Sequence, residues 1–153
     1  MRILVTGATG QVGWELRRSL ASLGEVIAPT RAELDLTQPE MVAAYVQALK
    51  PQLIVNPAAY TAVDKAESEP ELADKVNAQS VAALAAAAAR LDALLVHYST
   101  DYVFDGRKTT PYETSDAAAP VSAYGRSKLQ GEQAILASGC RHVIARTSWV
   151  YGA

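Results

Sequence analysis

The apolar residues of the chain change their spacing in a regular way from one end to the other. Short apolar runs rich in β-branched residues alternate with longer stretches in which apolar side chains recur at helical spacing. The short runs are typical of strands buried on both faces, and the helical spacing is typical of amphipathic helices. The pattern predicts strands at residues 2–6, 25–29, 52–55, 93–98 and 141–147, and helices at residues 11–23, 40–50, 69–90 and 122–138.

The alternation of strands and helices predicts an α/β fold. Every connection is long enough for a crossover, as a parallel sheet with helices on both faces requires. We therefore expect a doubly wound, Rossmann-type parallel sheet with the strand order 3-2-1-4-5, counted along the chain. Ligands of such sheets bind at the carboxyl ends of the strands where the order reverses. This order places the binding crevice beside the first and fourth strands.

Composition and charge narrow the function classes. A chain of 153 residues corresponds to one domain, and its 50% hydrophobic and 20% charged residues are ordinary for a globular protein. The net charge of −2 argues against nucleic acid as a partner, and no apolar run has the length of a membrane span. The single cysteine, Cys140, excludes an internal disulfide and a cysteine metal cluster. Met1 to Gly13 lacks the pattern of a signal peptide, so we expect a cytoplasmic protein.

The first loop carries a glycine pattern typical of nucleotide binding. Gly7, Gly10 and Gly13 stand between a predicted buried strand and a predicted amphipathic helix. In this context the first glycine permits a tight turn, the second lets the backbone approach a pyrophosphate, and the third lets the helix pack on the sheet. The second strand is followed by Arg31, where a cation suits a 2′-phosphate better than a bare ribose hydroxyl. Asp35 and Leu36 follow at a place where they could flank an adenine.

A second constellation indicates proton transfer to a carbonyl oxygen. Tyr124 and Lys128 are four residues apart, so they share one face of a helix. An ammonium beside a phenol is expected to lower the pKa of the phenol, which then donates its proton at neutral pH. Ser99 or Thr100, at the end of the fourth predicted strand, supplies a hydroxyl that could bind the same oxygen. With the glycine turn, this set predicts hydride transfer from a nicotinamide with Tyr124 as the acid.

These motifs resemble the extended short-chain dehydrogenase/reductases. The resemblance covers the whole chain and is carried by GATGQVGWEL (7–16), VNPAAYTAVDKAESEPE (55–71), HYSTDYVFDG (97–106), YGRSKLQGE (124–132) and RTSWVYG (146–152). Within the family, the second, third and fifth of these point to the branch that reduces the C4 ketone of dTDP-4-dehydro-L-rhamnose. The resemblance implies NADPH or NADH as cofactor and a nucleotide sugar as substrate. It also implies a homodimer with bound Mg²⁺ in some members, where Glu15 matches an implicated position, although a glutamate on the first predicted helix is more often simply solvated.

The resemblance also implies a role for each matching residue. Tyr124 is then the proton donor, Lys128 holds the nicotinamide ribose, and Thr100 has the hydroxyl role. The residues implied to contact the cofactor, with those of the glycine turn and Arg31, are Gly7, Gly10, Gln11, Val12, Gly13, Arg31, Asp35, Leu36, Ala59, Tyr60, Thr61, Tyr98, Tyr124 and Lys128. The residues implied to face the substrate are Val63, Thr100, Asp101 and Trp149.

Family members are nearly twice as long as this chain. We therefore expect residues 1–153 to be an incomplete dinucleotide-binding domain that lacks the C-terminal substrate-binding portion and is inactive alone. Two alternatives stay open. The branch also resembles the non-catalytic regulatory subunit of methionine adenosyltransferase, which binds a partner. A different nucleotide-sugar reductase or epimerase would carry the same catalytic set.

Overall fold

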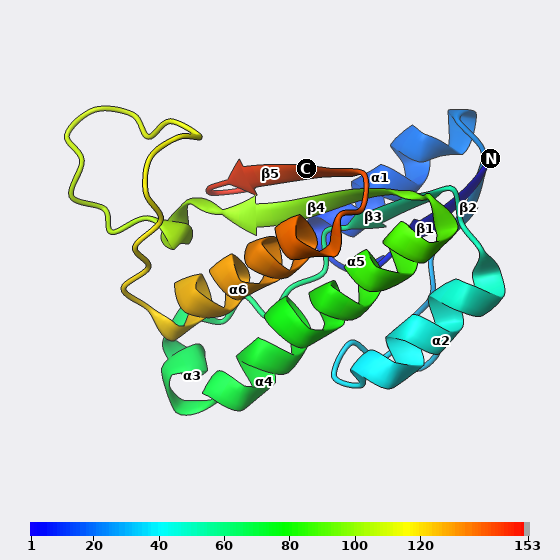
Figure 1. Ribbon diagram of the computed structural model, residues 1–153, viewed down its shortest axis with the longest axis horizontal. Coiled ribbons are helices and arrows are strands. Elements are labelled where there is room, and N and C mark those ends of the chain that lie inside the picture. The colour runs from blue at the N-terminus through cyan, green and yellow to red at the C-terminus, as the bar shows by residue number, and fades with distance from the viewer. Residues whose placement is uncertain (152–153) are drawn as a thin grey trace.

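The fold is an α/β sandwich built on one parallel sheet. The structure, a computed structural model, describes residues 1–151. Within this range the sheet consists of β1 (Arg2–Val5), β2 (Glu25–Ile27), β3 (Leu53–Asn56), β4 (Leu94–Thr100) and β5 (His142–Thr147). All neighbouring strands are parallel, which confirms the predicted doubly wound α/β class (Figure 1).

The expected strand order is wrong. The observed order is β2-β1-β3-β4-β5, so β3 lies between β1 and β4 instead of beyond β2 at the edge. All four residues of β3 are buried, as a central strand requires, whereas β2 has three residues and none of them is buried. Both orders use right-handed crossovers, so the alternation of elements did not distinguish them. The order reverses between β1 and β3, and the binding crevice is expected there.

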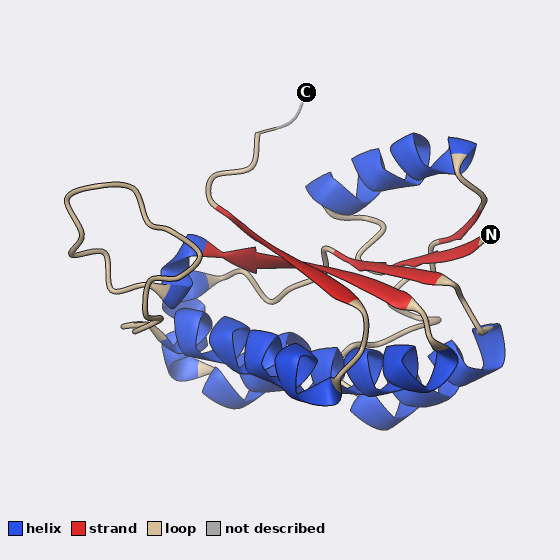
Figure 2. Cartoon of the chain, turned by 45° about the horizontal axis from the view of Figure 1, so that its top comes forward, coloured by secondary structure: helices blue, strands red, loops and turns tan. Residues whose placement is uncertain are grey.

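Helices cover the two faces of the sheet unequally. Figure 2 shows α1 (Gln11–Ser19) on one face and the remaining helices on the other. Those helices are α2 (Pro39–Leu49), α3 (Val63–Ser68), α4 (Pro70–Asp74), α5 (Ser80–Leu91) and α6 (Ala123–Ser138). The predicted helices do not include α3, because its six residues are too few to show a helical period. A π-helical turn, Lys75–Gln79, joins α4 to α5 within the predicted helix 69–90.

The core follows from the alternation of side chains along the strands. Leu4, Ile54 and Leu95 point to the face covered by α2, α5 and α6, where they join the largest buried cluster. Ile3 and Val55 belong to a second cluster on the opposite face, against α1. Each central strand buries residues on both faces, which explains why its residues are apolar without alternation.

The position of α6 depends on a close contact with the π-helical turn. A Cβ atom at Gly131 would lie 2.2 Å from the main-chain oxygen of Asn77, so only glycine allows this approach. The helix begins where Ser122 Oγ accepts a hydrogen bond from the N–H of Gly125 at 3.0 Å. It ends at Gly139, whose φ of 70° is left-handed.

We predict that Gly131→Ala destabilises the protein by about 1–3 kcal/mol, because the added methyl group must push α6 away from Asn77. Helix propensity alone would give the opposite sign, since alanine is favoured over glycine inside a helix. The free energy of unfolding in urea measures the effect. Gln130→Ala, at the exposed neighbouring position, is the control and is expected to change stability by less than about 0.5 kcal/mol. A stabilising Gly131→Ala would contradict the close contact.

Candidate functional site

Two adjoining cavities lie at the carboxyl ends of the strands. The larger has a volume of about 660 Å³ and the smaller about 400 Å³, and they share the backbone around Gly7, Thr9, Ala58 and Ala59. The larger cavity is lined by these expected site residues: Gly7, Gly10, Gln11, Val12, Gly13, Ala59, Thr61, Val63, Tyr98, Thr100, Asp101, Tyr124, Lys128 and Trp149. Arg31, Asp35, Leu36 and Tyr60 line the smaller one. The structure therefore brings every expected cofactor and substrate residue to one crevice, at the junction of β1 and β3.

Each glycine of the first turn occupies its position for a different physical reason. Gly7 has a φ of 58° and packs against Ala58, and a Cβ atom at Gly13 would lie 2.1 Å from the oxygen of Gly7. Both are therefore required by the fold itself. Gly10 has ordinary extended backbone angles, and a Cβ atom there would only touch the oxygen of Gly7 at 3.4 Å. A side chain at Gly10 would instead occupy the cavity, at the N-terminus of α1, where helix N–H groups favour an anion.

The smaller cavity combines a cation and a carboxylate. Arg31 Nε lies 3.8 Å from Asp35 Oδ1, and the Arg31 side chain is mostly exposed. The backbone N–H of Thr37 donates to Asp35 Oδ1 at 2.9 Å, and this hydrogen bond lowers the pKa of Asp35. Ser80 donates to the oxygen of Leu36 and fixes that loop to α5. The cavity thus offers both a group that attracts a phosphate and a group that repels one.

The hydroxyl groups of Tyr124 and Thr100 meet in the larger cavity. Tyr124 is 8% exposed, and its ring packs edge-on against Tyr102 with centroids 5.5 Å apart. Burial raises the pKa of Tyr124, a hydrogen bond with the Thr100 side chain lowers it, and the nearby Asp101 carboxylate raises it, with a net upward shift. Thr100, at the end of β4, therefore lies beside the Tyr124 hydroxyl, a position from which both hydroxyl groups could reach one oxygen atom.

The pKa of Tyr124 is raised, chiefly by burial, which corrects the expectation that the spacing of Tyr124 and Lys128 lowers it. Lys128 Nζ donates to the main-chain oxygen of Tyr98 at 2.6 Å and lies 3.4 Å from His97 Nε2. Burial lowers the pKa of Lys128 to about 8, against an upward effect of Glu132. The helical spacing places the two residues on one face, but the long lysine stem carries the ammonium down to β4.

Further polar residues support the site and were not predicted to belong to it. Glu132, on the same face of α6 as Lys128, pairs with Arg146 of β5 at 2.6 Å and accepts a hydrogen bond from Ser99. Its spacing of four residues from Lys128 was a signal that the motif analysis did not use. Asn77 accepts from the N–H of Tyr60 and donates to its oxygen and to Ser127 Oγ. No sequence signal marks the π-helical turn that turns Asn77 inward.

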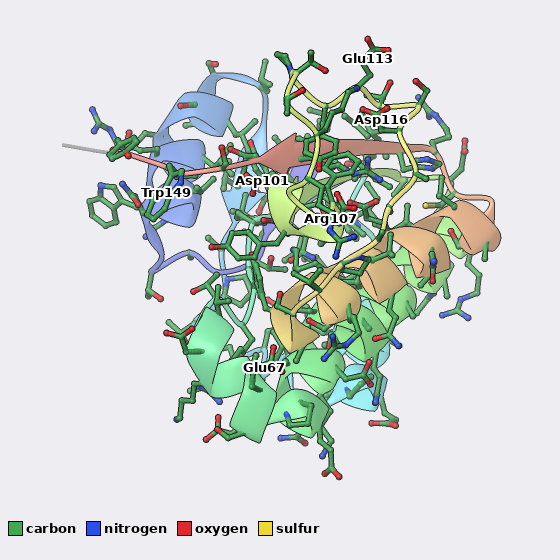
Figure 3. The ribbon with its side chains drawn as sticks, turned by 90° about the vertical axis from the view of Figure 1, so that its left-hand side faces the viewer. Glu67, Asp101, Arg107, Glu113, Asp116 and Trp149 are labelled. Carbon is green, nitrogen blue, oxygen red and sulfur yellow. The ribbon has the colours of Figure 1, made fainter. Side chains whose placement is uncertain are left out.

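The residues expected to face the substrate all line the larger cavity. Asp101 follows β4 directly and accepts a hydrogen bond from Thr100 Oγ1 at 3.2 Å. Trp149 is 80% exposed, with a φ of 42°, and Figure 3 shows it at the outer edge of the molecule. Gly152, the last residue of the fifth motif, lies outside the described residues. The irregular segment between Phe104 and Pro120 projects beyond the ends of the strands (Figure 1).

The described residues show neither a cluster of metal ligands nor a membrane-spanning helix. No group of three or more His, Cys, Asp or Glu side chains that could hold a metal ion occurs within residues 1–151. On the surface of α1, Glu15 Oε2 lies 3.8 Å from Arg18 Nη1. Among the helices of the same residues, none is long and apolar enough to cross a membrane.

Comparisons with known proteins agree with this geometry. The family model described as the RmlD substrate binding domain matches residues 1–153. A curated dTDP-4-dehydrorhamnose reductase of Burkholderia thailandensis is 56% identical over 153 residues, which is all of this chain and 51% of that protein. The crystal structure of a dTDP-4-dehydrorhamnose reductase from Clostridium acetobutylicum is 44% identical with a TM-score of 0.95, covering 99% of this chain and 55% of that one. The Bacillus anthracis dTDP-4-dehydrorhamnose reductase, solved in complex with NADP, is 38% identical with a TM-score of 0.92, covering 98% and 54%.

Proposed function

The chain belongs to the RmlD substrate binding domain family, and from this membership and the site we propose that the protein reduces dTDP-4-dehydro-L-rhamnose to dTDP-L-rhamnose with NADPH or NADH. The observation that carries the proposal is the meeting of Tyr124, Thr100 and Lys128 in one cavity with the glycine turn. The chain spans about half the length of the relatives it matches. Residues 1–153 would supply the cofactor-binding part, and the remaining length of the relatives would hold most of the nucleotide-sugar pocket.

The shape of the crevice fits a dinucleotide. Gly10 leaves room where a pyrophosphate would meet the N-terminus of α1, with Gln11 and Val12 beside it. The smaller cavity, with Asp35, Leu36 and Arg31, would take the adenosine. Ala59, Tyr60, Thr61 and Tyr98 would line the path between the two ends of the cofactor. The two cavities adjoin each other, so together they offer an elongated space in which an extended dinucleotide could lie.

The nicotinamide, when bound, supplies a hydride for the C4 carbon of the sugar. Residues of this chain would then protonate and orient the C4 carbonyl oxygen. Tyr124 donates its proton to that oxygen, and Thr100 hydrogen-bonds the same atom and orients the carbonyl. The phenol of Tyr124 holds its proton at neutral pH, because burial raises its pKa, while the hydrogen bond with Thr100 acts in the opposite direction and favours proton release. Lys128, fixed by Tyr98, would hold the nicotinamide ribose, while Val63, Asp101 and Trp149 would face the sugar.

The alternatives have less support. A non-catalytic regulatory subunit has no need of the buried Tyr124, Thr100 and Lys128 set, which is complete here. A different nucleotide-sugar reductase or epimerase would share that set, so turnover of dTDP-4-dehydro-L-rhamnose by the full-length protein separates it from the proposed reaction. A role in cell-surface polysaccharide synthesis, a cytoplasmic location, a homodimer and Mg²⁺ binding stay predictions, and sedimentation with and without Mg²⁺ tests the last two.

We predict that Tyr124→Phe in the full-length protein keeps the affinity for NADPH and lowers kcat by about 10²–10⁴-fold, the usual contribution of a general acid. Steady-state kinetics and calorimetric titration of NADPH measure the two effects. Tyr112→Phe is the matched control, because its hydroxyl bonds Asp105 in the loop and does not line either cavity. A kcat within about threefold of wild type would show that Tyr124 is not the acid.

We predict that Gly10→Val abolishes dinucleotide binding without unfolding the protein. The backbone at this position is extended and the fold has space for a Cβ atom, whereas the valine methyl groups would fill the pyrophosphate position. Calorimetry and thermal unfolding together measure this. Gly13→Ala is the contrasting variant, since its Cβ atom clashes with Gly7 and should lower stability as well as affinity. Equal NADPH affinity in Gly10→Val and wild type would remove this loop from the site.

We predict a preference for NADPH over NADH of about tenfold in kcat/KM, which Arg31→Ala removes. A charge-assisted hydrogen bond to a 2′-phosphate is worth roughly 1.5–3 kcal/mol, and exposure and salt keep the benefit at the low end. The neighbouring Asp35 repels the same phosphate, so Asp35→Asn should raise the preference. The ratio of kcat/KM for the two cofactors is the measurement. An unchanged ratio in Arg31→Ala would mean that Arg31 only faces solvent.

A further inference from the structure

A chain of buried polar side chains leads from Lys128 beneath the cavity to the end of β1. Lys128 Nζ lies 3.4 Å from His97 Nε2, and His97 Nδ1 lies 3.0 Å from Asn56 Nδ2. Asn56 Oδ1 in turn accepts a hydrogen bond from Thr6 Oγ1. The four side chains come from α6, β4, β3 and the residue after β1, and each is at most 1% exposed. With so little water contact, every hydrogen bond in this chain must be made within the protein.

The direction of these hydrogen bonds fixes which ring nitrogen of His97 carries the proton. A neutral imidazole has one donor and one acceptor nitrogen. Because Asn56 Nδ2 donates to His97 Nδ1, the ring proton is on Nε2 and faces Lys128. An ammonium has only donors, so it would place N–H against N–H. This arrangement therefore fits Lys128 as a neutral amine that accepts from His97 Nε2 and donates to the oxygen of Tyr98.

The ammonium form of Lys128 requires the opposite direction. His97 Nε2 must then accept, so the ring proton moves to Nδ1. A half-turn of the Asn56 amide brings Oδ1 to Nδ1 and lets Nδ2 donate to Thr6 Oγ1. A threonine hydroxyl can donate or accept, so Thr6 can take part in either direction of the chain. The same four side chains can thus reverse their hydrogen bonds together with the charge on Lys128.

The electrostatics of the surroundings make both states accessible. Burial and the Lys128 charge lower the pKa of His97 well below its usual value, so the ring stays neutral. Burial brings the pKa of Lys128 to about 8. The charged and titratable groups around Lys128 are Glu132 on its own helix, Arg146 of β5 paired with Glu132, and Asp101 and Tyr124 at the cavity. Since Lys128 lines that cavity, the proton it loses can pass to solvent there.

We propose that His97 is a positioning residue that carries its proton on Nδ1 when Lys128 is an ammonium and on Nε2 when Lys128 is a neutral amine. The charge on Lys128 and the hydrogen-bond direction through Asn56 and Thr6 then change together. The net change is the loss of one proton to solvent, and His97 holds one ring proton before and after. The inference rests on the proposed function in that Lys128 is the residue that would hold the nicotinamide ribose. Through His97, Lys128 keeps a defined position in both charge states.

The ring nitrogens of His97 report the coupling directly. The full-length protein with ¹⁵N-labelled histidine is followed by NMR from about pH 6 to about pH 10, a range that spans the Lys128 transition. We expect the protonated and unprotonated ring signals of His97 to exchange places, with a midpoint near the Lys128 pKa of about 8. His97→Gln assigns the signals. His142→Gln is the matched control, since His142 is exposed with Nδ1 2.9 Å from the oxygen of Cys140, and the exchange should persist in it.

Two variants separate this coupling from an ordinary buried histidine. Lys128→Met should leave His97 in one tautomer at every pH. Asn56→Asp places an acceptor-only carboxylate against Nδ1, so the ring proton should stay on Nδ1 throughout. A single tautomer across the range in wild type would overturn the proposal, as would an exchange that persists in Lys128→Met. Because the NMR signals need neither substrate nor turnover, a failure of the proposed reductase activity is a separate result.

Discussion

The close packing of α6 against β4 and the π-helical turn is the constraint on which the site depends. Tyr124 and Lys128 lie on α6, and Thr100 and Tyr98 lie at the end of β4. The helix can come so near only because Gly131 faces the oxygen of Asn77 without a side chain between them. The Glu132–Arg146 pair ties the same helix to β5. Glu132 is buried and Arg146 is half-buried, so the pair adds little net stability over apolar residues, and its value here is a fixed helix position.

Burial of the Lys128 amine determines much of the chemistry below the cavity. A polar group taken out of water needs hydrogen-bond partners, and Lys128 has the oxygen of Tyr98 and the ring of His97. His97 in turn depends on Asn56, which stands beside it on the neighbouring strand β3. The central position of β3 therefore has two consequences. It creates the crevice where the strand order reverses, and it places the amide of Asn56 next to His97, which contacts Lys128.

The local features of this protein were predictable from the sequence. Strands, helices and their alternation follow from the spacing of apolar residues, and the turn at Gly7, Gly10 and Gly13 follows from short-range backbone geometry. The pair of Tyr124 and Lys128 follows from the helical period. Those signals lie within a few residues of one another, so the fold class, the glycine turn and the pair of Tyr124 and Lys128 could be named in advance, whereas most other residues lining the crevice came from the family resemblance.

The remaining features depend on contacts between segments far apart in the chain. The order of β1, β3 and β4 depends on which strand buries both faces most completely, and alternation of elements is the same for either order. The position of α6 against β4 brings Lys128 Nζ to the oxygen of Tyr98. The expectation that Lys128 acts on its i, i+4 neighbour Tyr124 was therefore wrong. The inward turn of Asn77 needs a π-helical turn that no local pattern marks. The sequence by itself determined the elements and the reactive groups, whereas the tertiary structure decided which groups touch, because burial and hydrogen-bond partners exist only once the layers pack.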